Sequence, residues 1–424
     1  MGRGMRGRAP PADRNGGRRT PSRVRVERAG AAAARRAASR YRFGPGRGRS
    51  AWRLCAARRM RRLAFDGRRR RVRLRRAARR VDRGAFRRLV SRSVFPGVGR
   101  RRTAGRHEGR ALGSRAMIIV VGSVNVDFVI KGARIPRPGE TIGGGRFLQV
   151  PGGKGANQAV AALRASESPV AFVAAVGDDA LGRSMRDRFL SLGLNGDHIA
   201  VVPSAATGVA LIMVAEDGEN AISVAPGANG ELRPSHIDAL PDDLFRASRV
   251  LLASLEVPRD TVARAVERAR RFGLLTIVNP APADPFWAAR SGPPRVDFLT
   301  PNETEASQLV GIDDPRRAAA ELAERTGASV LLTEGARGAG LFGTETGRFP
   351  AKRVTPVDTT AAGDAWNGAF AAALAEHRSL ADAARFAVAA GTLSVTRDGA
   401  QPSLPGRREI LEWLAEPPGD DGQA

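Results

Sequence analysis

The hydrophobic pattern changes character at about residue 117. Before it, apolar residues show little periodicity, whereas after it short β-branched runs alternate with stretches whose apolar positions recur at helical spacing. The first such run, 118–121, predicts a buried strand of a parallel sheet. Later runs predict strands at 170–176, 250–253, 274–278, 296–299 and 329–332. The helical pattern predicts helices at 159–164, 178–192, 259–272, 315–326, 379–394 and 406–415.

This alternation predicts the α/β class, with a mostly parallel sheet covered by helices on both faces. A second pattern interrupts it, because the runs 209–214 and 221–224 flank a polar turn at 216–220 and predict a hairpin. Weaker strands near 128–131 and 142–150 could join that hairpin. We therefore expect a small β-sheet lid, built from about 128–150 and 207–225.

Charge is distributed unevenly along the 424 residues, whose formal net charge is +28. Residues 1–116 hold 39 arginines and no lysine against 5 acidic residues, a net charge of +34. The remaining 308 residues hold 31 basic and 37 acidic residues, a net charge of −6. The basic character thus belongs to the first segment, and the rest has the composition of an ordinary globular domain.

Three interpretations of residues 1–116 compete, and all start from the expectation that this segment is disordered. It could bind nucleic acid, since blocks of arginine bind phosphate. It could be an organelle transit peptide, although six serines in 116 residues fit that poorly. We favour a third interpretation, translation of GC-rich DNA upstream of a true start at Met117. The expected organisation is an extension over 1–116, one large α/β domain over 117–415 and a flexible tail over 416–424.

Several classes of protein are disfavoured by what the sequence lacks. Cys55 is the only cysteine and the four histidines are scattered, so neither an intrachain disulfide nor a Cys/His metal site is expected. No apolar run is long enough to cross a bilayer, and Met1 starts no signal-peptide pattern. We expect a cytoplasmic protein with no membrane partner.

The stretch 358–364, Asp-Thr-Thr-Ala-Ala-Gly-Asp, carries the most specific chemical signal. Good helix formers follow it, and the small residues Ala361, Ala362 and Gly363 let backbone N–H groups converge at a helix N-terminus, which attracts anions. A carboxylate at Asp364 is unexpected in a simple phosphate-binding loop, because it would repel the phosphate. It makes sense if Asp364 takes a proton from an attacking hydroxyl while the N–H groups hold the phosphoryl group. Taken alone, the stretch is better explained by a helix-start acid, and the other motifs favour the catalytic role.

Polar residues also follow the predicted strands. Asn125 and Asp127 come after the first strand, where they could bind sugar hydroxyls or, with equal weight, stabilise an Asx turn. The segment 152–158 is Gly-rich, carries Lys154 and Asn157, and does not match a P-loop. The remaining strand-end residues are Glu256, Asn279, Asn302 with Glu305, and the run 333–338. Because carboxyl ends of parallel strands share one edge, we expect these groups to converge near Asp364.

Six ordered motifs across 117–415 resemble the PfkB carbohydrate kinase family, and within it the ribokinases. They are Gly122-Ser123-x-Asn125-x-Asp127, 152–158, 279–283, 301–305, Asp358 to Asp364 with 367–369, and 399–403. The resemblance implies a Rossmann-like domain with a β-sheet lid that also forms a homodimer contact. It implies transfer of the ATP γ-phosphoryl group to the 5-hydroxyl of D-ribose.

The resemblance also implies roles for individual residues. Asp364 matches the general base, and the N–H groups of Ala361, Ala362 and Gly363 match the anion hole. The implied sugar contacts are Asn125, Asp127, Gly153, Lys154, Asn157 and Glu256. The implied ATP contacts are Asn302, Thr333, Glu334, Gly335, Ala336, Arg337, Gly338, Gly363 and Val388. Glu305 matches the Mg²⁺-associated residue, and an activating K⁺ site is implied at Asp358, Thr360, Ser394, Arg397, Gly399 and Ser403.

Three positions depart from the family pattern. Val388 stands where relatives often have His or Asn, which removes one polar contact to adenine and could alter nucleotide preference. Thr360 replaces an aliphatic residue and Trp366 a Phe, and neither change removes a chemical role. Two alternatives stay open: the same chemistry on 2-deoxyribose, fructose or adenosine, and nucleic-acid binding through the 1–116 segment. A non-catalytic α/β protein has little support.

Overall fold

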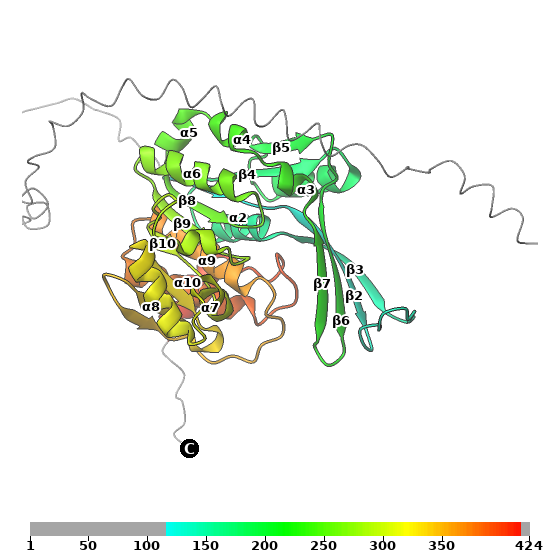
Figure 1. Cartoon of the computed structure of the whole chain (residues 1–424). Coiled ribbons are helices and arrows are strands. Elements are labelled where there is room, and N and C mark those ends of the chain that lie inside the picture. The colour runs from blue at the N-terminus through cyan, green and yellow to red at the C-terminus, as the bar shows by residue number, and fades with distance from the viewer. Residues whose placement is uncertain (1–115, 417–424) are drawn as a thin grey trace, which may run out of the picture. The chain divides into compact units, whose positions relative to one another are not determined.

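A computed structural model describes residues 116–416, and the expectations for residues 1–115 and 417–424 lie outside this range. The described part contains two sheets (Figure 1). The main sheet has the strand order β13-β12-β11-β10-β9-β8-β1-β4-β5. Its strands are β1 (Met117–Val121), β4 (Val170–Gly177), β5 (Ile199–Val202), β8 (Ser248–Ser254), β9 (Leu275–Asn279), β10 (Phe298–Leu299), β11 (Ser329–Thr333), β12 (Ala339–Phe342) and β13 (Gly347–Phe349).

The predicted α/β fold is confirmed, since the pairs from β5 through β11 are parallel and only β12 and β13 add antiparallel pairs at one edge. The longer helices are α2 (Lys154–Ala165), α3 (Ala180–Ser191), α6 (Arg259–Arg271), α7 (Glu303–Val310), α8 (Pro315–Thr326), α9 (Ala362–Ala375), α10 (Leu380–Ser394) and α11 (Arg407–Ala415). Short elements are α4 (Pro234–Asp238), α5 (Asp242–Arg246) and the 3₁₀ turns η2 (Gly227–Glu231), η3 (Pro285–Ala288) and η4 (Gly335–Arg337).

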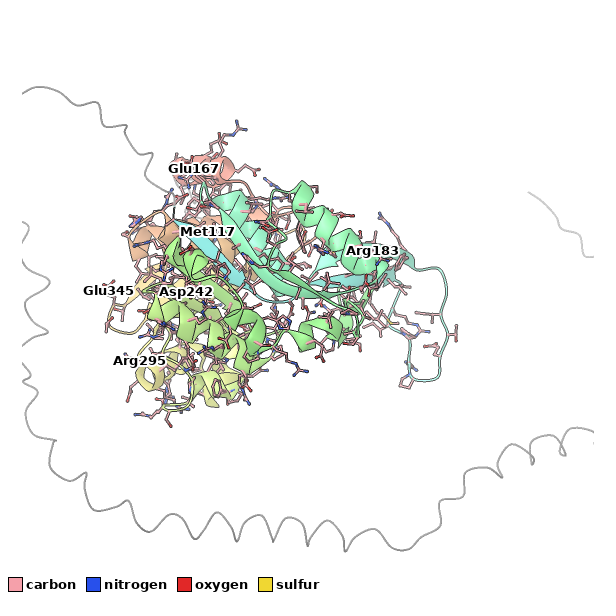
Figure 2. The ribbon with its side chains drawn as sticks, turned by 90° about the horizontal axis from the view of Figure 1, so that it is seen from above. Met117, Glu167, Arg183, Asp242, Arg295 and Glu345 are labelled. Carbon is pink, nitrogen blue, oxygen red and sulfur yellow. The ribbon has the colours of Figure 1, made fainter. Side chains whose placement is uncertain are left out.

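Strand β1 separates two hydrophobic cores. Its side chains alternate between the faces of the sheet, so Ile118 and Val120 pack with α2, α9 and α10 while Ile119 and Val121 pack with α6, α7 and α8. All four side chains are fully buried. Burial on both faces explains why the strand reads as a continuous apolar run. Charged side chains lie on the outer helices instead, as at Arg183 of α3 and Asp242 of α5 (Figure 2).

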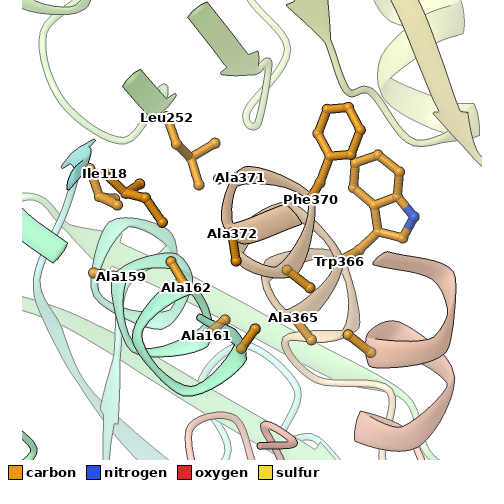
Figure 3. Close-up of a cluster of buried hydrophobic side chains, with 14 of the residues drawn as sticks. Ile118, Ala159, Ala161, Ala162, Leu252, Ala365, Trp366, Phe370, Ala371 and Ala372 are labelled. Carbon is orange, nitrogen blue, oxygen red and sulfur yellow. The ribbon is translucent and has the colours of Figure 1, made fainter. Parts of the chain in front are cut away.

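Helices α2 and α9 pack closely because small residues line their contact (Figure 3). Ala161 and Ala162 of α2 face Ala365 and Ala372 of α9 in this cluster. Gly368 allows the closest approach, since a Cβ built there would lie 2.4 Å from Ala161 Cβ. This packing brings the N-terminal turns of α2 and α9 together.

The second sheet has four strands in the order β3-β2-β6-β7 and projects from the main body (Figure 1). They are β2 (Asn125–Gly132), β3 (Arg146–Gly152), β6 (Gly208–Ala215) and β7 (Asn220–Ala225). Strand β2 pairs parallel with β6 and antiparallel with β3, and β6 and β7 form the predicted hairpin. The small predicted lid sheet is therefore present.

Some boundaries differ from the predictions. Helix α2 begins at Lys154 rather than near 159, because Gly153 at φ 90° turns the chain directly into the helix. Strand β10 has two residues rather than four. Strands β5, β12 and β13 and helix α7 were not predicted. Across residues 116–416, the helices are too short or too polar for any of them to cross a membrane.

Candidate active site

Asp364 lies in the first turn of α9 and is 7% exposed. Asn157 Nδ2 donates to its Oδ2 and Gln158 Nε2 donates to its Oδ1, both at 3.0 Å. Burial raises the pKa of Asp364 to about 6, although Lys154 and the two amides act in the opposite direction. The carboxylate is thus held by neutral donors and keeps the basicity that a proton acceptor needs.

The turn that precedes Asp364 presents unpaired N–H groups. Ala361 caps α9 in the left-handed conformation at φ 61°, which is unusual for alanine. Ala362 N donates to Thr359 O at 3.3 Å, while the N–H groups of Ala361 and Gly363 donate to no described residue. Together with the helix dipole, these groups make the turn chemically suited to an anion.

The predicted sugar contacts gather beside this turn, at the base of the small sheet. Asp127 of β2 has its pKa raised to about 6, by burial first and then by the nearby carboxylates of Glu256 and Asp364. Asn125, also on β2, is 4% exposed, and its Oδ1 accepts from Asn229 Nδ2 at 2.8 Å. A cluster of carboxylate and amide groups can bind several hydroxyls at once.

The start of α2 completes this cluster. Glu256 follows β8, and its Oε2 accepts from Lys154 N at 2.9 Å and from Ser123 Oγ at 2.5 Å. Burial acts to lower the pKa of Lys154, yet the surrounding carboxylates, Asp364 first, raise it overall. The ammonium group of Lys154 therefore stays charged among three carboxylates. The neighbouring Gly153 leaves no room for a side chain, because a Cβ there would lie 2.7 Å from Asn125 N.

The predicted nucleotide residues lie at the ends of β10 and β11. Asn302 and Glu305 form a capping box at α7: Glu305 N donates to Asn302 Oδ1 at 2.8 Å, and Asn302 N to Glu305 Oε2 at 2.9 Å. Burial raises the pKa of Glu305. Glu334 is buried and pairs with Arg316 at 2.9 Å, while Arg337 pairs with Glu303 at 2.5 Å.

The other members of that set have no charged side chain. Gly335 and Gly338 have φ 56° and 91°, and a Cβ at Gly338 would lie 2.0 Å from Phe349 O. Thr333 ends β11 and Ala336 lies in η4. Val388 is 7% exposed and belongs to the core that contains α9 and α10.

The predicted K⁺ residues come from two loops that Asp358 ties together. Asp358 Oδ1 accepts from Thr360 N at 2.8 Å, and Oδ2 accepts from Gly399 N at 2.9 Å. Burial acts to raise the pKa of Asp358, but these hydrogen bonds and Lys131 hold it below its ordinary value. The backbone carbonyls of Asp358, Thr360, Arg397 and Gly399 accept no hydrogen bond from residues 116–416. Free carbonyls fit a large monovalent cation.

The other two members of this set are buried. Ser394 Oγ donates to Gly391 O and Ser403 Oγ to Ala400 O, each at 2.8 Å. Ser394 O also accepts from Arg397 N at 3.3 Å, whereas Ser403 O accepts no hydrogen bond from residues 116–416. Within the described residues, no group of three or more His, Cys, Asp or Glu side chains is placed to hold a metal.

Sequence reasoning missed four side chains that shape this site. Gln158 belongs to a motif that was singled out, but no role was given to it. Ser123 contacts Glu256, Thr300 contacts Asn367, and Asn229 orients Asn125 across 104 residues of sequence. Contacts over such separations leave no local signal in one sequence.

The pfkB family carbohydrate kinase model matches residues 115–407. The chain belongs to this family. It is 38% identical over 308 residues to a ribokinase of Haemophilus influenzae, covering 71% of this chain and 99% of that protein. It is 36% identical over 309 residues to a deoxyribokinase of Salmonella typhi, covering 70% and 98%.

Solved structures agree with the family assignment. The ribokinase of Thermotoga maritima superimposes with a TM-score of 0.63 at 35% identity, covering 71% of this chain and 99% of that one. Arabidopsis thaliana ribokinase, complexed with ribose and ATP, gives 0.61 at 29% identity, covering 72% and 100%. The protein is accordingly a carbohydrate kinase, a transferase that uses ATP.

Proposed function

We propose that this carbohydrate kinase transfers the γ-phosphoryl group of ATP to the 5-hydroxyl of D-ribose, giving D-ribose 5-phosphate and ADP. The observation that carries the proposal is the placement of Asp364, a buried carboxylate of raised pKa directly after a turn with free N–H groups. Ribokinases among the similar proteins support ribose as the sugar.

In this proposal Asp364 accepts the proton of the attacking hydroxyl. The hydroxyl oxygen then attacks the γ-phosphorus. The bond between the γ-phosphorus and the β,γ-bridging oxygen breaks as ADP leaves. The turn at Ala361, Ala362 and Gly363 stabilises the charge on the transferring group through N–H donors and the helix dipole. Asn157 and Gln158 keep the carboxylate oriented toward the hydroxyl.

The sugar is bound by groups at the base of the small sheet. Asp127 and Asn125 accept from or donate to adjacent hydroxyls, and Lys154, Asn157 and Glu256 contact the opposite edge of the sugar. Backbone at Gly153 allows close approach. The small sheet would lie over the bound sugar as a lid and exclude water, which would otherwise compete as phosphoryl acceptor.

Nucleotide is held on the other side of the turn. Asn302, Val388 and the segment Thr333–Gly338 contact ATP, with Glu334 and Arg337 contributing through the backbone, since their side chains are already paired. Mg²⁺ bound through the ATP phosphates near Glu305 would neutralise phosphate charge. K⁺ at the carbonyls between Asp358 and Ser403 would fix the geometry of the adjacent turn.

The face of the small sheet opposite Asp127 favours a homodimer. Phe147 of β3 and Leu211 of β6 are each more than half exposed on this face, and Ile130 of β2 and Met213 of β6 lie beside them. An apolar surface of this kind is typical of a protein contact. We infer that two copies pair through their lids.

Product analysis with the full chain tests the proposal. Mg-ATP would be supplied with D-ribose, 2-deoxyribose, fructose or adenosine, each with and without K⁺, and the product identified by ³¹P NMR. We expect ribose 5-phosphate to form fastest and K⁺ to stimulate it. Faster turnover of 2-deoxyribose would favour the second candidate, which the similarity to a deoxyribokinase supports. No phosphorylated product would contradict the proposal.

A further inference from the structure

Buried side chains connect the two ends of the first turn of α9 through a closed series of hydrogen bonds. Gln158 Nε2 donates to Asp364 Oδ1 and to Asn279 Oδ1, both at 3.0 Å. Asn279 Nδ2 donates to Thr300 O at 2.9 Å. Thr300 Oγ1 donates to Asn367 Oδ1 at 2.6 Å, and Asn367 Nδ2 donates to Gly363 O at 2.8 Å. We call this series the amide circuit; its members are Asp364, Gln158, Asn279, Thr300, Asn367 and Gly363.

The amide circuit is protected from water. Gln158 is fully buried, Thr300 and Asn367 are 1% exposed, and Asn279 is 6% exposed. It joins α2, the ends of β9 and β10, and α9, and it closes because Gly363 directly precedes Asp364. The circuit therefore connects the proposed base with the backbone of the proposed anion hole.

The direction of every donor in the circuit is fixed by chemistry. An ionised carboxylate and a backbone carbonyl only accept, so the amide nitrogens must face Asp364, Thr300 O and Gly363 O. The oxygen of Asn367 is then left to accept from the Thr300 hydroxyl. No amide can rotate by 180° without bringing two acceptors together.

Gln158 carries an additional sign of this constraint. Its Oε1 is buried and has no hydrogen-bond partner among the described residues. An unpaired buried acceptor is destabilising, and an amide with only a packing role would be expected to satisfy it. Here both N–H groups are instead directed to Asp364 and Asn279.

We propose that Gln158 and the amide circuit are positioning elements of the phosphoryl transfer, which orient Asp364 and the Gly363 backbone as one unit. The inference rests on the proposed role of Asp364 as base but not on which sugar is the substrate. Gln158 acts through Asp364 and is not expected to touch the sugar.

Other charged groups also influence Asp364 and must be kept constant in any test. Lys154 of α2, Glu256 after β8, Asp127 of β2 and Glu305 of α7 all interact with it electrostatically. A substitution at Gln158 leaves these four groups in place. Its effect on the titration of Asp364 therefore reports the lost hydrogen bond.

The test compares Gln158→Met with Thr300→Val, which breaks the circuit at its far side and leaves the Asp364 contact intact. For Gln158→Met we expect kcat to fall about 10- to 100-fold, the size expected for one hydrogen bond to a charged group. The KM for the sugar should stay unchanged, and the acidic limb of kcat/KM should move up by about one pH unit. Thr300→Val should lower kcat less and leave the acidic limb in place.

Infrared titration of the carboxyl band provides a readout that needs no substrate. The band absent from Asp364→Asn identifies Asp364, and its midpoint should rise in Gln158→Met but not in Thr300→Val. If Gln158→Met does not fold, Asn279→Leu replaces it, because it removes the acceptor of the second Gln158 N–H and should shift the midpoint in the same direction. An unmoved midpoint and acidic limb in the folded variant would overturn the inference. A wild-type protein without kinase activity would instead contradict the proposed function, while the infrared result would still test the circuit.

Discussion

Asp364 and Glu334 are both buried carboxylates at the carboxyl edge of the main sheet, but their surroundings differ. Asp364 accepts hydrogen bonds from two neutral amides, and its charged neighbours include both Lys154 and carboxylates. Glu334 is paired directly with the guanidinium of Arg316. The first arrangement leaves the Asp364 carboxylate able to take up a proton, whereas the second holds the Glu334 carboxylate in a structural ion pair.

The same contrast extends to the two halves of the proposed site. In the sugar half, side chains from β2, α2 and α9 lie close together, and Asn157 Oδ1 is a buried acceptor with no hydrogen-bond partner among the described residues. In the nucleotide half, Asn302, Glu305, Glu334 and Arg337 already have partners from neighbouring residues. We therefore expect side-chain substitutions to affect catalysis in the sugar half and stability in the nucleotide half.

The largest kinetic effect among substitutions outside Asp364 is expected for Gly152→Ala. A Cβ at this position would lie 2.2 Å from Asp127 Oδ2, so the carboxylate must move. Displacement on this scale should lower kcat/KM for the sugar about 100-fold. The KM for ATP should not change.

Gly143→Ala is the matched control for that substitution, because a Cβ there meets no atom within 4 Å. Steady-state kinetics with each substrate varied in turn measure both variants. If Gly152→Ala and the wild type have equal kcat/KM for the sugar, the position of the Asp127 carboxylate does not matter for sugar binding or transfer.

The acidic limb of the pH profile should appear at about pH 6. Asp364 and Asp127 interact, and burial raises the pKa of each to about 6. Below that pH the protonated Asp364 cannot accept the hydroxyl proton, so kcat/KM should fall at least about tenfold per pH unit. A flat profile down to pH 5 would contradict an ionised carboxylate as base.

Asp358→Asn should raise the K⁺ concentration needed for half-maximal activity severalfold. Thr360 N and Gly399 N donate to different oxygens of Asp358, and in asparagine one of these oxygens is replaced by an NH₂ donor, so the two loops should separate. Saturating K⁺ should restore most of the rate. Activity would be measured against KCl at constant ionic strength, with Asp398→Asn as a control that removes an equal charge from an exposed neighbour. Identical K⁺ curves for both variants would place the cation elsewhere.

The smallest kinetic effect is expected for Arg316→Met. Removing the guanidinium leaves Glu334 buried without its partner, which should destabilise the fold by about 1–3 kcal/mol. Because the pair is structural, kcat and the KM for ATP should stay close to the wild type. Thermal unfolding and kinetics would be compared with Arg317→Met, an exposed neighbour. A raised KM for ATP at unchanged stability would contradict the contrast between the halves.

The sequence predicted the fold well where the apolar pattern was unbroken. The run at 118–121 and the helical stretch at 259–272 predicted elements within a residue or two of β1 and α6. Strands β12 and β13 were missed, because glycine and arginine interrupt their three or four residues and no continuous β-branched run marks them. The start of α2 was placed late, because glycines within 152–155 conceal a helix whose backbone is set by Gly153.

For the site, the sequence identified residue types but not their partners. Asp364 and Asn157 were singled out, and the structure places them in contact. The side chain of Glu334 was grouped with the nucleotide contacts, and nothing local to it indicates the ion pair with Arg316, 18 residues away. Gln158 and Asn229 act through contacts across more than 100 residues, which depend on tertiary packing.

A single-turnover measurement with Asp364→Asn tests the central claim most directly. The full chain would be mixed with Mg-ATP and ribose at saturating K⁺, and ribose 5-phosphate formation followed by rapid quench, with ATP binding and circular dichroism checked separately. Loss of a general base predicts a rate about 1,000-fold below the wild type, with ATP binding unchanged and the protein folded. A folded Asp364→Asn protein that forms ribose 5-phosphate at the wild-type rate would contradict the account.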